Sequence, residues 1–405
     1  MFTMLNYKGT TVYILCFLFI FDLFQTFSNW AGNKYITLEY VSKNMAVCPP
    51  YFQSCVRYYF FDTIPMSYGQ NILYMVLGIF LFLSLYFLYT KEYQKFLFFI
   101  SIPFLYKIIY QYFLTYLIPG NYNVLGIFFG LVLLFSLYKV FYLRVLLVVF
   151  YLCAAGIKVH TGYMTGSVFT SLSLGVPLVP RFLLPYAGIF FFLLCIIAPL
   201  VLLFAKNIRH RVGALVLLTG FHMYSISMVG FRYSLLLIPL LWLLFYFEKE
   251  EIVFEKKYLQ DYGAIVIILT MIILQVIPLF IKGDERMTGE GYRYGYYMYD
   301  GNHQCESHKK VYYKDGSTEE MNTKNITAMY SCDPYEEWFK INRFCRLQKV
   351  EKISWTYDHS LNGLPYRRIV KNENACTLKY TPFSHNEWIH EDGEQLTKEV
   401  IKNSI

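Results

Sequence analysis

Three ionisable side chains, Lys107, Lys158 and His222, lie within or at the end of long apolar stretches. A charged group near the centre of a bilayer costs about 2.5–3.5 kcal/mol, so such groups usually face a partner or an internal cavity. A lysine against a low-dielectric wall gives up its proton more readily and can then act as a base near neutral pH. Lys158 and His222 are therefore candidate catalytic residues for proton transfer at the membrane.

Each of these residues also has a purely structural interpretation. Lys107 and Gln111 share a helix face because residues four apart lie on one side, and Lys107 can snorkel or bond within a helix bundle. Lys158 can anchor a helix end at the membrane interface. His222 can be a hydrogen-bonded core histidine, and Arg232 can be a solvated residue at a turn. The residue types alone leave both interpretations open.

Membrane-spanning helices must position these residues. Of the 405 residues, 56% are hydrophobic and only 16% are charged, whereas a soluble protein usually carries about 25% charged residues. The apolar stretches end near residue 281, and the remainder resembles an ordinary soluble sequence. Because one span needs roughly 20 apolar residues, we predict nine spans. They are residues 11–27, 70–89, 96–117, 124–142, 145–158, 184–205, 212–228, 233–247 and 264–281.

This pattern predicts two domains. Residues 1–281 form a polytopic α-helical membrane domain, and residues 282–405 form a domain outside the lipid that is α+β or mainly β. Asp22 interrupts the first apolar stretch, and no clear cleavage site follows it. We therefore interpret this stretch as a retained span rather than a signal peptide.

Basic residues indicate the orientation of the spans. They fall in alternate short loops, and basic residues in short loops favour the cytoplasmic side. The N-terminus is then cytoplasmic, and the C-terminal domain is extracytoplasmic, facing the periplasm, a lumen or the exterior. The net charge of +8 is explained by this topology, so we expect a lipid bilayer and no nucleic acid as partner. The loop residues are Lys91, Lys95, Lys139, Arg144, Lys206, Arg209, Arg211, Lys256 and Lys257.

Six cysteines fall on the predicted extracytoplasmic side, where an oxidising compartment would allow disulfides. Cys48 and Cys55 are close in sequence, and the two prolines between them reduce the entropy lost when the loop closes. We therefore predict that these two pair with each other, and leave the pairing of the other four open. The other four are Cys305, Cys332, Cys345 and Cys376.

Other features of the cysteine-bearing regions are less specific. No C-x-x-C pair occurs among the six cysteines and their spacings are long, so we expect no metal site. Cys16, Cys153 and Cys195 fall in predicted spans, where a thiol acts as a small apolar group. Asn325 begins an N-I-T sequon, which is a candidate glycosylation site in a host that glycosylates.

The segment at residues 162–185 joins the fifth and sixth spans and is rich in glycine and proline. Such a moderately apolar segment is a candidate re-entrant or interfacial element that covers a cavity. The topology places the end of the fifth span and the outer half of the seventh on the same side of the membrane. We therefore predict that Lys158 and His222 face one cavity, with residues 162–185 as its lid.

Four short motifs resemble a known family when they are taken in chain order. Residues 155–158 (AGIK) and 162–166 (GYMTG) resemble the A-G-x-x-K … W-x-x-G stretch of the vitamin K-dependent γ-carboxylase superfamily. Residues 221–233 (FHMYSISMVGFRY) are similar to its H … S … G-x-F-P-[YW] segment. Residues 292–298 and 311–316 resemble its aromatic-x-M segment and its V-x-x-x-D-G strand and turn. Prokaryotic relatives in this superfamily are called HTTM proteins.

The resemblance implies an activity and roles for particular residues. The activity would be that of a carbon–carbon lyase that carboxylates glutamate in a secreted peptide or protein, with reduced vitamin K or another quinol as cofactor. Lys158 would take a proton from the quinol, and His222 would polarise a quinone oxygen. Supporting residues would be Lys107, Gln111, His160, Tyr163 and Arg232. The sequence departs from the family pattern at Lys158, which comes two residues after Gly156 where the family usually has three. It also departs at Tyr163, where the family has tryptophan, and at Arg232, where it has proline.

Two other functions remain open. One is a non-carboxylase HTTM protein that aids the maturation or export of a secreted peptide. The other is a small-molecule transporter that uses Lys107, Lys158 and His222 along a pathway. Transport is the weaker alternative, because the sequence shows no pair of discontinuous helices in matching halves.

Overall fold

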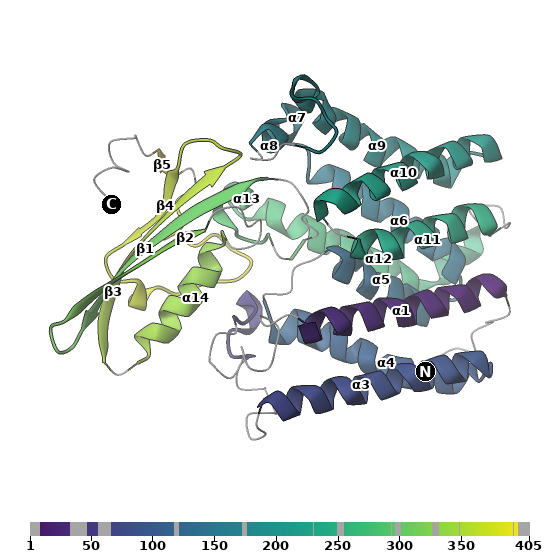
Figure 1. Cartoon of the computed structure of the whole chain (residues 1–405), viewed down its shortest axis with the longest axis horizontal. Coiled ribbons are helices and arrows are strands. Elements are labelled where there is room, and N and C mark those ends of the chain that lie inside the picture. The colour runs from purple at the N-terminus through teal and green to yellow at the C-terminus, as the bar shows by residue number, and fades with distance from the viewer. Residues whose placement is uncertain are drawn as a thin grey trace. The chain divides into compact units, whose positions relative to one another are not determined.

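The chain forms two compact units, each built from several stretches of the sequence (Figure 1). The helical unit contains Met1–Ala46, Ser54–Gly156 and Phe191–Ile273, and the sheet unit contains Val47–Gln53, Ile157–Phe190 and Leu274–Ile405. The computed structural model describes residues 9–32, 47–55, 66–116, 121–171, 176–229, 231–248, 255–292, 294–295, 301–325, 332–347, 349–391 and 393–395.

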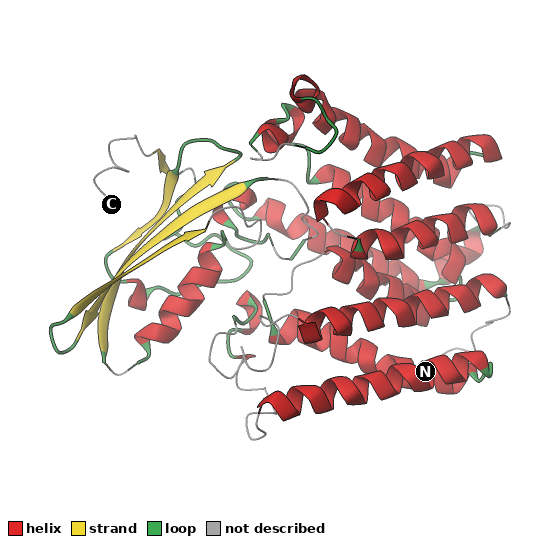
Figure 2. Cartoon of the chain, in the orientation of Figure 1, coloured by secondary structure: helices red, strands yellow, loops and turns green. Residues whose placement is uncertain are grey.

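Long apolar helices dominate the chain (Figure 2). They are α1 (Thr10–Gly32), α3 (Met66–Tyr89), α4 (Tyr93–Ile109) with its π-helical extension η3 (Tyr110–Leu114), α5 (Asn121–Phe135), α6 (Lys139–Gly156), α9 (Leu184–Phe204), α10 (Ile208–Val229), α11 (Arg232–Trp242) with its π-helical extension η5 (Leu243–Phe247), and α12 (Tyr262–Val276) with the 3-10 turn η7 (Ile277–Phe280).

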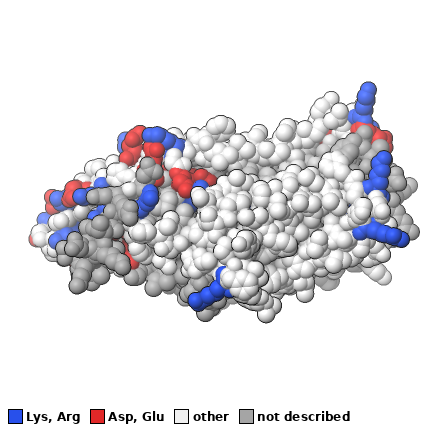
Figure 3. All heavy atoms as spheres, turned by 90° about the horizontal axis from the view of Figure 1, so that it is seen from above, with Lys and Arg blue, Asp and Glu red and all other residues white. Residues whose placement is uncertain are grey.

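Six helices in the described part of the chain are long and apolar enough to cross a membrane, and the segments Tyr122–Phe135 and Arg232–Phe247 are apolar but shorter. Every predicted span falls mainly within one of the helices given above. The helices indicate a membrane protein, whereas the count of nine spans stays a prediction. On the face seen in Figure 3, a broad band of the described surface shows almost no Lys, Arg, Asp or Glu, as lipid contact requires.

Five basic residues that we assigned to loops lie in α-helices instead: Lys95 in α4, Lys139 and Arg144 in α6, and Arg209 and Arg211 in α10. α6 begins at Lys139 rather than near residue 145, and Arg144 is only 2% exposed. The Arg144 guanidinium donates hydrogen bonds to the backbone carbonyls of Leu244 (2.7 Å) and Glu248 (3.2 Å), at the end of η5. The prediction was wrong because Arg144 binds carbonyls that the end of a helix leaves without intrahelical partners.

A layer of aromatic rings packs α1, α4 and α5 together. The Phe19 ring meets Phe104 edge-on at 5.0 Å and Phe129 edge-on at 5.9 Å between ring centroids. Gly130 leaves room for this layer, because a Cβ atom there would lie 2.5 Å from Phe19 and 2.7 Å from Phe104. The close approach of the three helices therefore depends on the absence of a side chain at position 130.

The sheet unit contains a five-stranded antiparallel sheet with the order β2-β1-β3-β4-β5. The strands are β1 (His303–Tyr313), β2 (Thr318–Asn325), β3 (Val350–Leu361), β4 (Arg367–Asn372) and β5 (Glu394–Gln395). The amphipathic helix α14 (Pro334–Cys345) packs on β3. The core includes the fully buried Trp355 and Tyr357. The sequence prediction of a C-terminal domain containing a sheet is confirmed.

Disulfides reinforce the sheet unit. Cys305 in β1 bonds to Cys332, and Cys345 at the end of α14 bonds to Cys376. Cys48 and Cys55 are also disulfide-bonded, and their pairing with each other stays a prediction. The three remaining cysteines lie in apolar helices, as expected, and form no disulfide: Cys16, Cys153 and Cys195.

Two earlier segments of the chain are part of the sheet unit. In the first, the carbonyl of Cys48 accepts a hydrogen bond from the Tyr335 hydroxyl at 2.6 Å. In the second, which contains the short helices α7 (Thr161–Met164) and α8 (Ser167–Thr170), the Ser171 carbonyl accepts one from the Asn302 side chain at 3.1 Å. The segment that we predicted as a lid is therefore bonded to the beginning of the sheet; its residues 172–175 lie outside the described residues.

We expect Gly130→Ala to lower the free energy of unfolding by about 1–3 kcal/mol, because the added methyl group overpacks the aromatic layer. The matched control is Gly213→Ala in α10, where nothing lies within 4 Å of an added Cβ atom. That control should be neutral or stabilising by up to about 1 kcal/mol, since alanine favours helix over glycine. Unfolding by SDS in mixed micelles measures both values, and equal effects would contradict the packing described for Gly130.

Candidate functional site

Lys158 lies two residues beyond the end of α6 and is only 6% exposed. Its ammonium nitrogen is 5.7 Å from the centroid of the buried Tyr163 ring. His160 caps the N-terminus of α7, where its Nδ1 accepts a hydrogen bond from the backbone N–H of Tyr163 at 3.4 Å. The short helix α7 therefore brings three predicted site residues together within the sheet unit.

Tyr163 is fixed by close backbone packing. A Cβ atom at Gly188, near the start of α9, would lie 2.0 Å from the Tyr163 carbonyl oxygen. Gly166 follows one turn later with φ of +73°, a conformation that strongly favours glycine. The glycines in and after the motif at residues 162–166 therefore let the α7 segment approach the start of α9.

His222 is a buried residue of α10 that contacts two neighbouring helices. Its Nε2 shares a short hydrogen bond of 2.5 Å with the Tyr151 hydroxyl from α6, and its backbone carbonyl accepts one from Ser234 of α11 at 3.0 Å. Its Nδ1 has no hydrogen-bond partner among the described residues. A Tyr151 hydroxyl that donates to Nε2 would leave the proton of a neutral ring on Nδ1, where it could be donated to another group.

Tyr151 was missed by the sequence interpretation. It is two helical turns before Lys158, and a tyrosine in an apolar span is common in a chain with 39 tyrosines. Its role depends on a contact with a residue 71 positions later, which no local pattern encodes.

Lys107 is ion-paired inside the helical unit. Its Nζ lies 2.8 Å from Asp22 Oδ2 of α1, and both side chains are completely buried. Of the two structural interpretations of Lys107, the structure shows bonding within the helix bundle and not snorkelling towards the membrane surface. Gln111 follows one turn later and is 8% exposed. The sequence showed Asp22 only as an interruption of the first span and did not reveal it as the partner of Lys107.

The remaining predicted residues do not join these groups. Arg232 begins α11 with an exposed side chain, which suits a solvated residue at a turn. Asn325 ends β2, and the two following sequon residues lie outside the described part of the chain. Lys158 belongs to the sheet unit and His222 to the helical unit, so their shared cavity stays a prediction.

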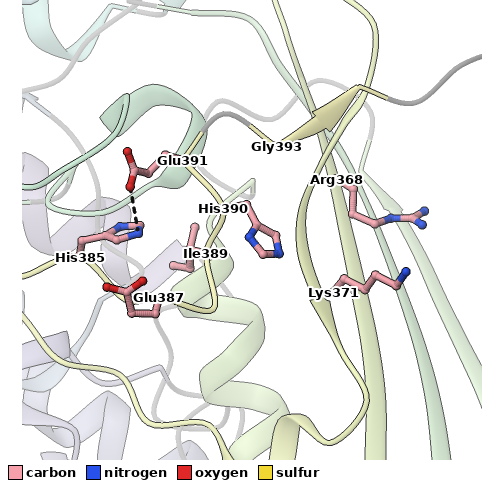
Figure 4. A pocket seen from close by; sticks show the side chains of 8 residues that line it. All are labelled: Arg368, Lys371, His385, Glu387, Ile389, His390, Glu391 and Gly393. Atoms are coloured by element: carbon pink, nitrogen blue, oxygen red, sulfur yellow. Dashed lines mark ion pairs between the residues drawn. The ribbon is translucent and has the colours of Figure 1, made fainter.

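The sheet unit also carries an open pocket of about 560 Å³. Figure 4 shows His385 and Glu391 facing each other on one side, with Arg368 and Lys371 extending from β4 on the other. Arg368 is held by Asp358 through two hydrogen bonds of 2.8 and 2.9 Å. The pocket thus offers cationic and anionic groups to a polar ligand. The complete lining is Arg368, Lys371, His385, Glu387, Ile389, His390, Glu391 and Gly393.

Glu290 supports this pocket from below the surface. It is 1% exposed, and its carboxylate accepts hydrogen bonds from His385 Nδ1 (2.7 Å) and from the backbone and side chain of Asn386 (both 2.8 Å). Burial raises the pKa of Glu290, although these hydrogen bonds oppose the shift. The carboxylate fixes the position of His385, whose other ring nitrogen faces Glu391 at 3.8 Å.

Two buried histidines form a hydrogen-bonded chain at the beginning of the sheet. His359 Nδ1 lies 2.8 Å from the Met287 carbonyl, and His359 Nε2 lies 3.1 Å from His303 Nδ1. A carbonyl only accepts, so neutral His359 carries its proton on Nδ1 and His303 donates from Nδ1. His303 Nε2 is then unprotonated, and it has no hydrogen-bond partner among the described residues.

Burial lowers the pKa of both rings, to about 4 for His303 and about 3 for His359. No local sequence pattern indicates this pair, because its members are 56 residues apart on adjacent strands. No group of three or more His, Cys, Asp or Glu residues suited to a metal ion occurs in the described ranges.

No family model, curated protein or solved structure matches this chain. The resemblance to the γ-carboxylase superfamily therefore rests on the short motifs and on their order along the sequence.

The histidine pair makes the stability of the sheet depend on pH. Between pH 6.5 and about 4 the unfolded chain binds a proton at position 303 that the folded chain does not. The stabilisation is complete above pH 6.5 and is lost as the pH falls towards 4, by roughly 3 kcal/mol for His303 alone.

Hydrogen exchange in β1 and β3, corrected for the intrinsic effect of pH, should therefore show decreasing protection over this range. His303→Gln should make the decrease shallower, whereas His308→Gln, on the same strand but partly exposed, should leave it unchanged. An identical pH profile in the wild type and His303→Gln would refute this role.

Proposed function

We propose that this chain is a membrane-embedded enzyme of the γ-carboxylase type, with Lys158 as its base. The observation that carries the proposal is the environment of Lys158, which is 6% exposed beside the Tyr163 ring. An interfacial anchor extends its ammonium group into the lipid headgroups and water. A buried lysine beside an aromatic ring is instead suited to exchange a proton with a bound molecule.

A reduced vitamin K or another quinol would be the cofactor. When bound with dioxygen, it would supply the strong base that removes a proton from the γ-carbon of glutamate, to which carbon dioxide then adds. Lys158 would accept the proton of a quinol hydroxyl. His222, held by Tyr151 through Nε2, would donate from Nδ1 to a quinone oxygen.

The proposed topology is a cytoplasmic N-terminus and an extracytoplasmic sheet unit. Disulfides support it, because all six bonded cysteines lie in or next to the segments of the sheet unit, and disulfides persist in oxidising compartments. The proposed substrate is a secreted peptide or protein. The open pocket with cationic and anionic groups supports peptide binding by the sheet unit.

The same pocket favours a second function without carboxylation, in which the chain binds a secreted peptide and aids its maturation or export. Mass spectrometry of co-expressed secreted proteins, with and without this chain, separates the two functions. Carboxylation predicts a mass gain equal to carbon dioxide on glutamate residues. An altered cleavage pattern or secreted yield, with no such gain, supports the second function.

We expect Lys158→Arg to reduce carboxylation by at least about 100-fold, because arginine keeps its charge and does not deprotonate near neutral pH. Folding should survive, as judged by gel filtration in detergent and circular dichroism. Lys206→Arg, at an exposed position just after α9, is the matched control and should retain full activity. Unchanged carboxylation by a folded Lys158→Arg variant would assign Lys158 a structural role.

A further inference from the structure

The Asp22–Lys107 ion pair marks a point where three helices meet. Asp22 lies on α1 and Lys107 on α4, with 2.8 Å between the charged atoms and no exposure of either side chain. Gly126 of α5 completes the contact, because a Cβ atom there would lie 2.4 Å from Asp22 Oδ2 and 2.7 Å from Lys107 Nζ. A charged pair is thus enclosed by helix backbones in an apolar bundle.

Contacts on either side of the pair define the register of the helices. Tyr122 of α5 donates a hydrogen bond of 2.8 Å to Thr26 of α1. Thr26 lies one turn after Asp22 in α1, whereas Tyr122 lies one turn before Gly126 in α5. α5 therefore runs antiparallel to α1. Trp30 of α1 meets Tyr110 with 5.1 Å between ring centroids, and both follow the charged residues in sequence. α1 and α4 therefore run in the same direction.

This register places three carboxamide side chains about one helical turn from the pair, all on the same side of it. Gln25 is three residues after Asp22, Gln111 is four after Lys107, and Asn123 is three before Gly126. Each of these carboxamides has a buried oxygen without a hydrogen-bond partner among the described residues. The same is true of the carboxylate oxygen Oδ1 of Asp22.

All four unpartnered atoms are acceptors as placed, and no donor among the described residues is within hydrogen-bond reach of them. Leaving a buried polar atom without a partner costs about 1–3 kcal/mol, and such groups in folded proteins usually have a reason. A proton on Asp22 Oδ1 would supply a donor for a neighbouring carboxamide oxygen. A proton also needs no cavity, which suits a site where even a methyl group at position 126 would collide with Asp22 and Lys107.

The surroundings limit which charges can act on this cluster. Of the helices that pack around the pair, α3 and α5 contain no charged residue. Beyond the pair itself, α1 has none, α4 has only Lys95, and α11 has only Arg232, whose charge acts on the Tyr122 hydroxyl. The other titratable groups close by are the hydroxyls of Tyr106, Tyr110 and Tyr122 and, one to two turns along α1, the thiol of Cys16.

Aromatic layers lie on both sides of the cluster. Phe19, Phe104 and Phe129 form the layer one turn before Asp22, and the Trp30 and Tyr110 rings pack at a tilt on the other side. The polar atoms are therefore confined to a thin layer of the bundle.

We propose that Asp22 and Lys107 form an intramembrane proton-binding site, in which Asp22 Oδ1 accepts the proton and the carboxamides of Gln25, Gln111 and Asn123 stabilise the protonated form. The proton comes from bulk solvent and returns there, with no bond other than O–H made or broken. The site is independent of the proposed carboxylase activity.

Infrared difference spectroscopy of the full chain in lipid, titrated with pH, tests the proposal. Subtraction of the Asp22→Asn spectra removes the signals of carboxyl groups common to both proteins. A protonated-carboxyl band should remain in this difference, grow as the pH falls and shift on exchange into heavy water. Because that variant leaves Lys107 without its countercharge, the double variant Asp22→Asn with Lys107→Met provides a second test that removes both charges. Gln111→Leu should shift the midpoint pH of the band.

Asp261→Asn is the matched control. Asp261 is also a buried carboxylate, but it accepts hydrogen bonds from Ser136 and from the backbone of Leu137 and Ala264, and its loss should leave the band in place. The absence of a pH-dependent carboxyl band from the difference between the wild type and both Asp22 variants would overturn the proposal. A response to sodium ions at constant pH, with none to pH, would replace the proton by a metal cation.

Discussion

A charged group inside a bilayer requires a partner of opposite charge or a hydrogen-bonding group within the protein. In the helical unit, Asp22 and Lys107 meet this requirement by forming a buried ion pair. Removing one member of a buried pair typically costs about 3–5 kcal/mol, because the other charge is left uncompensated. The pair therefore constrains which faces of α1 and α4 meet, and it makes α1 an integral part of the bundle. Gly126 is a consequence of the same constraint, since α5 can approach the two charges only without a side chain there.

Charged residues at the ends of the helices also have partners within the protein. Arg144 uses its guanidinium to bind the carbonyls that η5 leaves without intrahelical partners. Asp261, by contrast, is an acceptor at helix beginnings. Its carboxylate accepts hydrogen bonds from backbone N–H groups just before α6 and at the beginning of α12. Charged residues near the membrane boundary therefore hold helix ends to one another. Counting such residues as loop charges, as a topology rule does, overlooks this structural use.

The apolar helices and the separate sheet could be predicted because hydrophobicity is a local property of the sequence. The six paired cysteines followed from composition and inferred compartment. Partnerships across long separations could not be predicted, since nothing near Lys107 identifies Asp22 and nothing near His303 identifies His359. Tyr151 was missed for the same reason, although His222 and Lys158 were singled out. Residue type thus revealed several members of the candidate sites, and only the three-dimensional contacts supplied their partners.

The sheet unit is discontinuous in sequence, and this sets an order of events during biosynthesis. The ribosome releases Val47–Gln53 and Ile157–Phe190 long before it makes β1 and β3. Tyr335 and Asn302, which bond to those two segments, are among the later parts of the chain. The segment that carries Lys158 therefore lacks its hydrogen bond to Asn302 until the last third of the protein is being translated. A chain that terminates before Asn302 would insert its helices and still lack the hydrogen bond between Ser171 and Asn302 that joins this segment to the sheet.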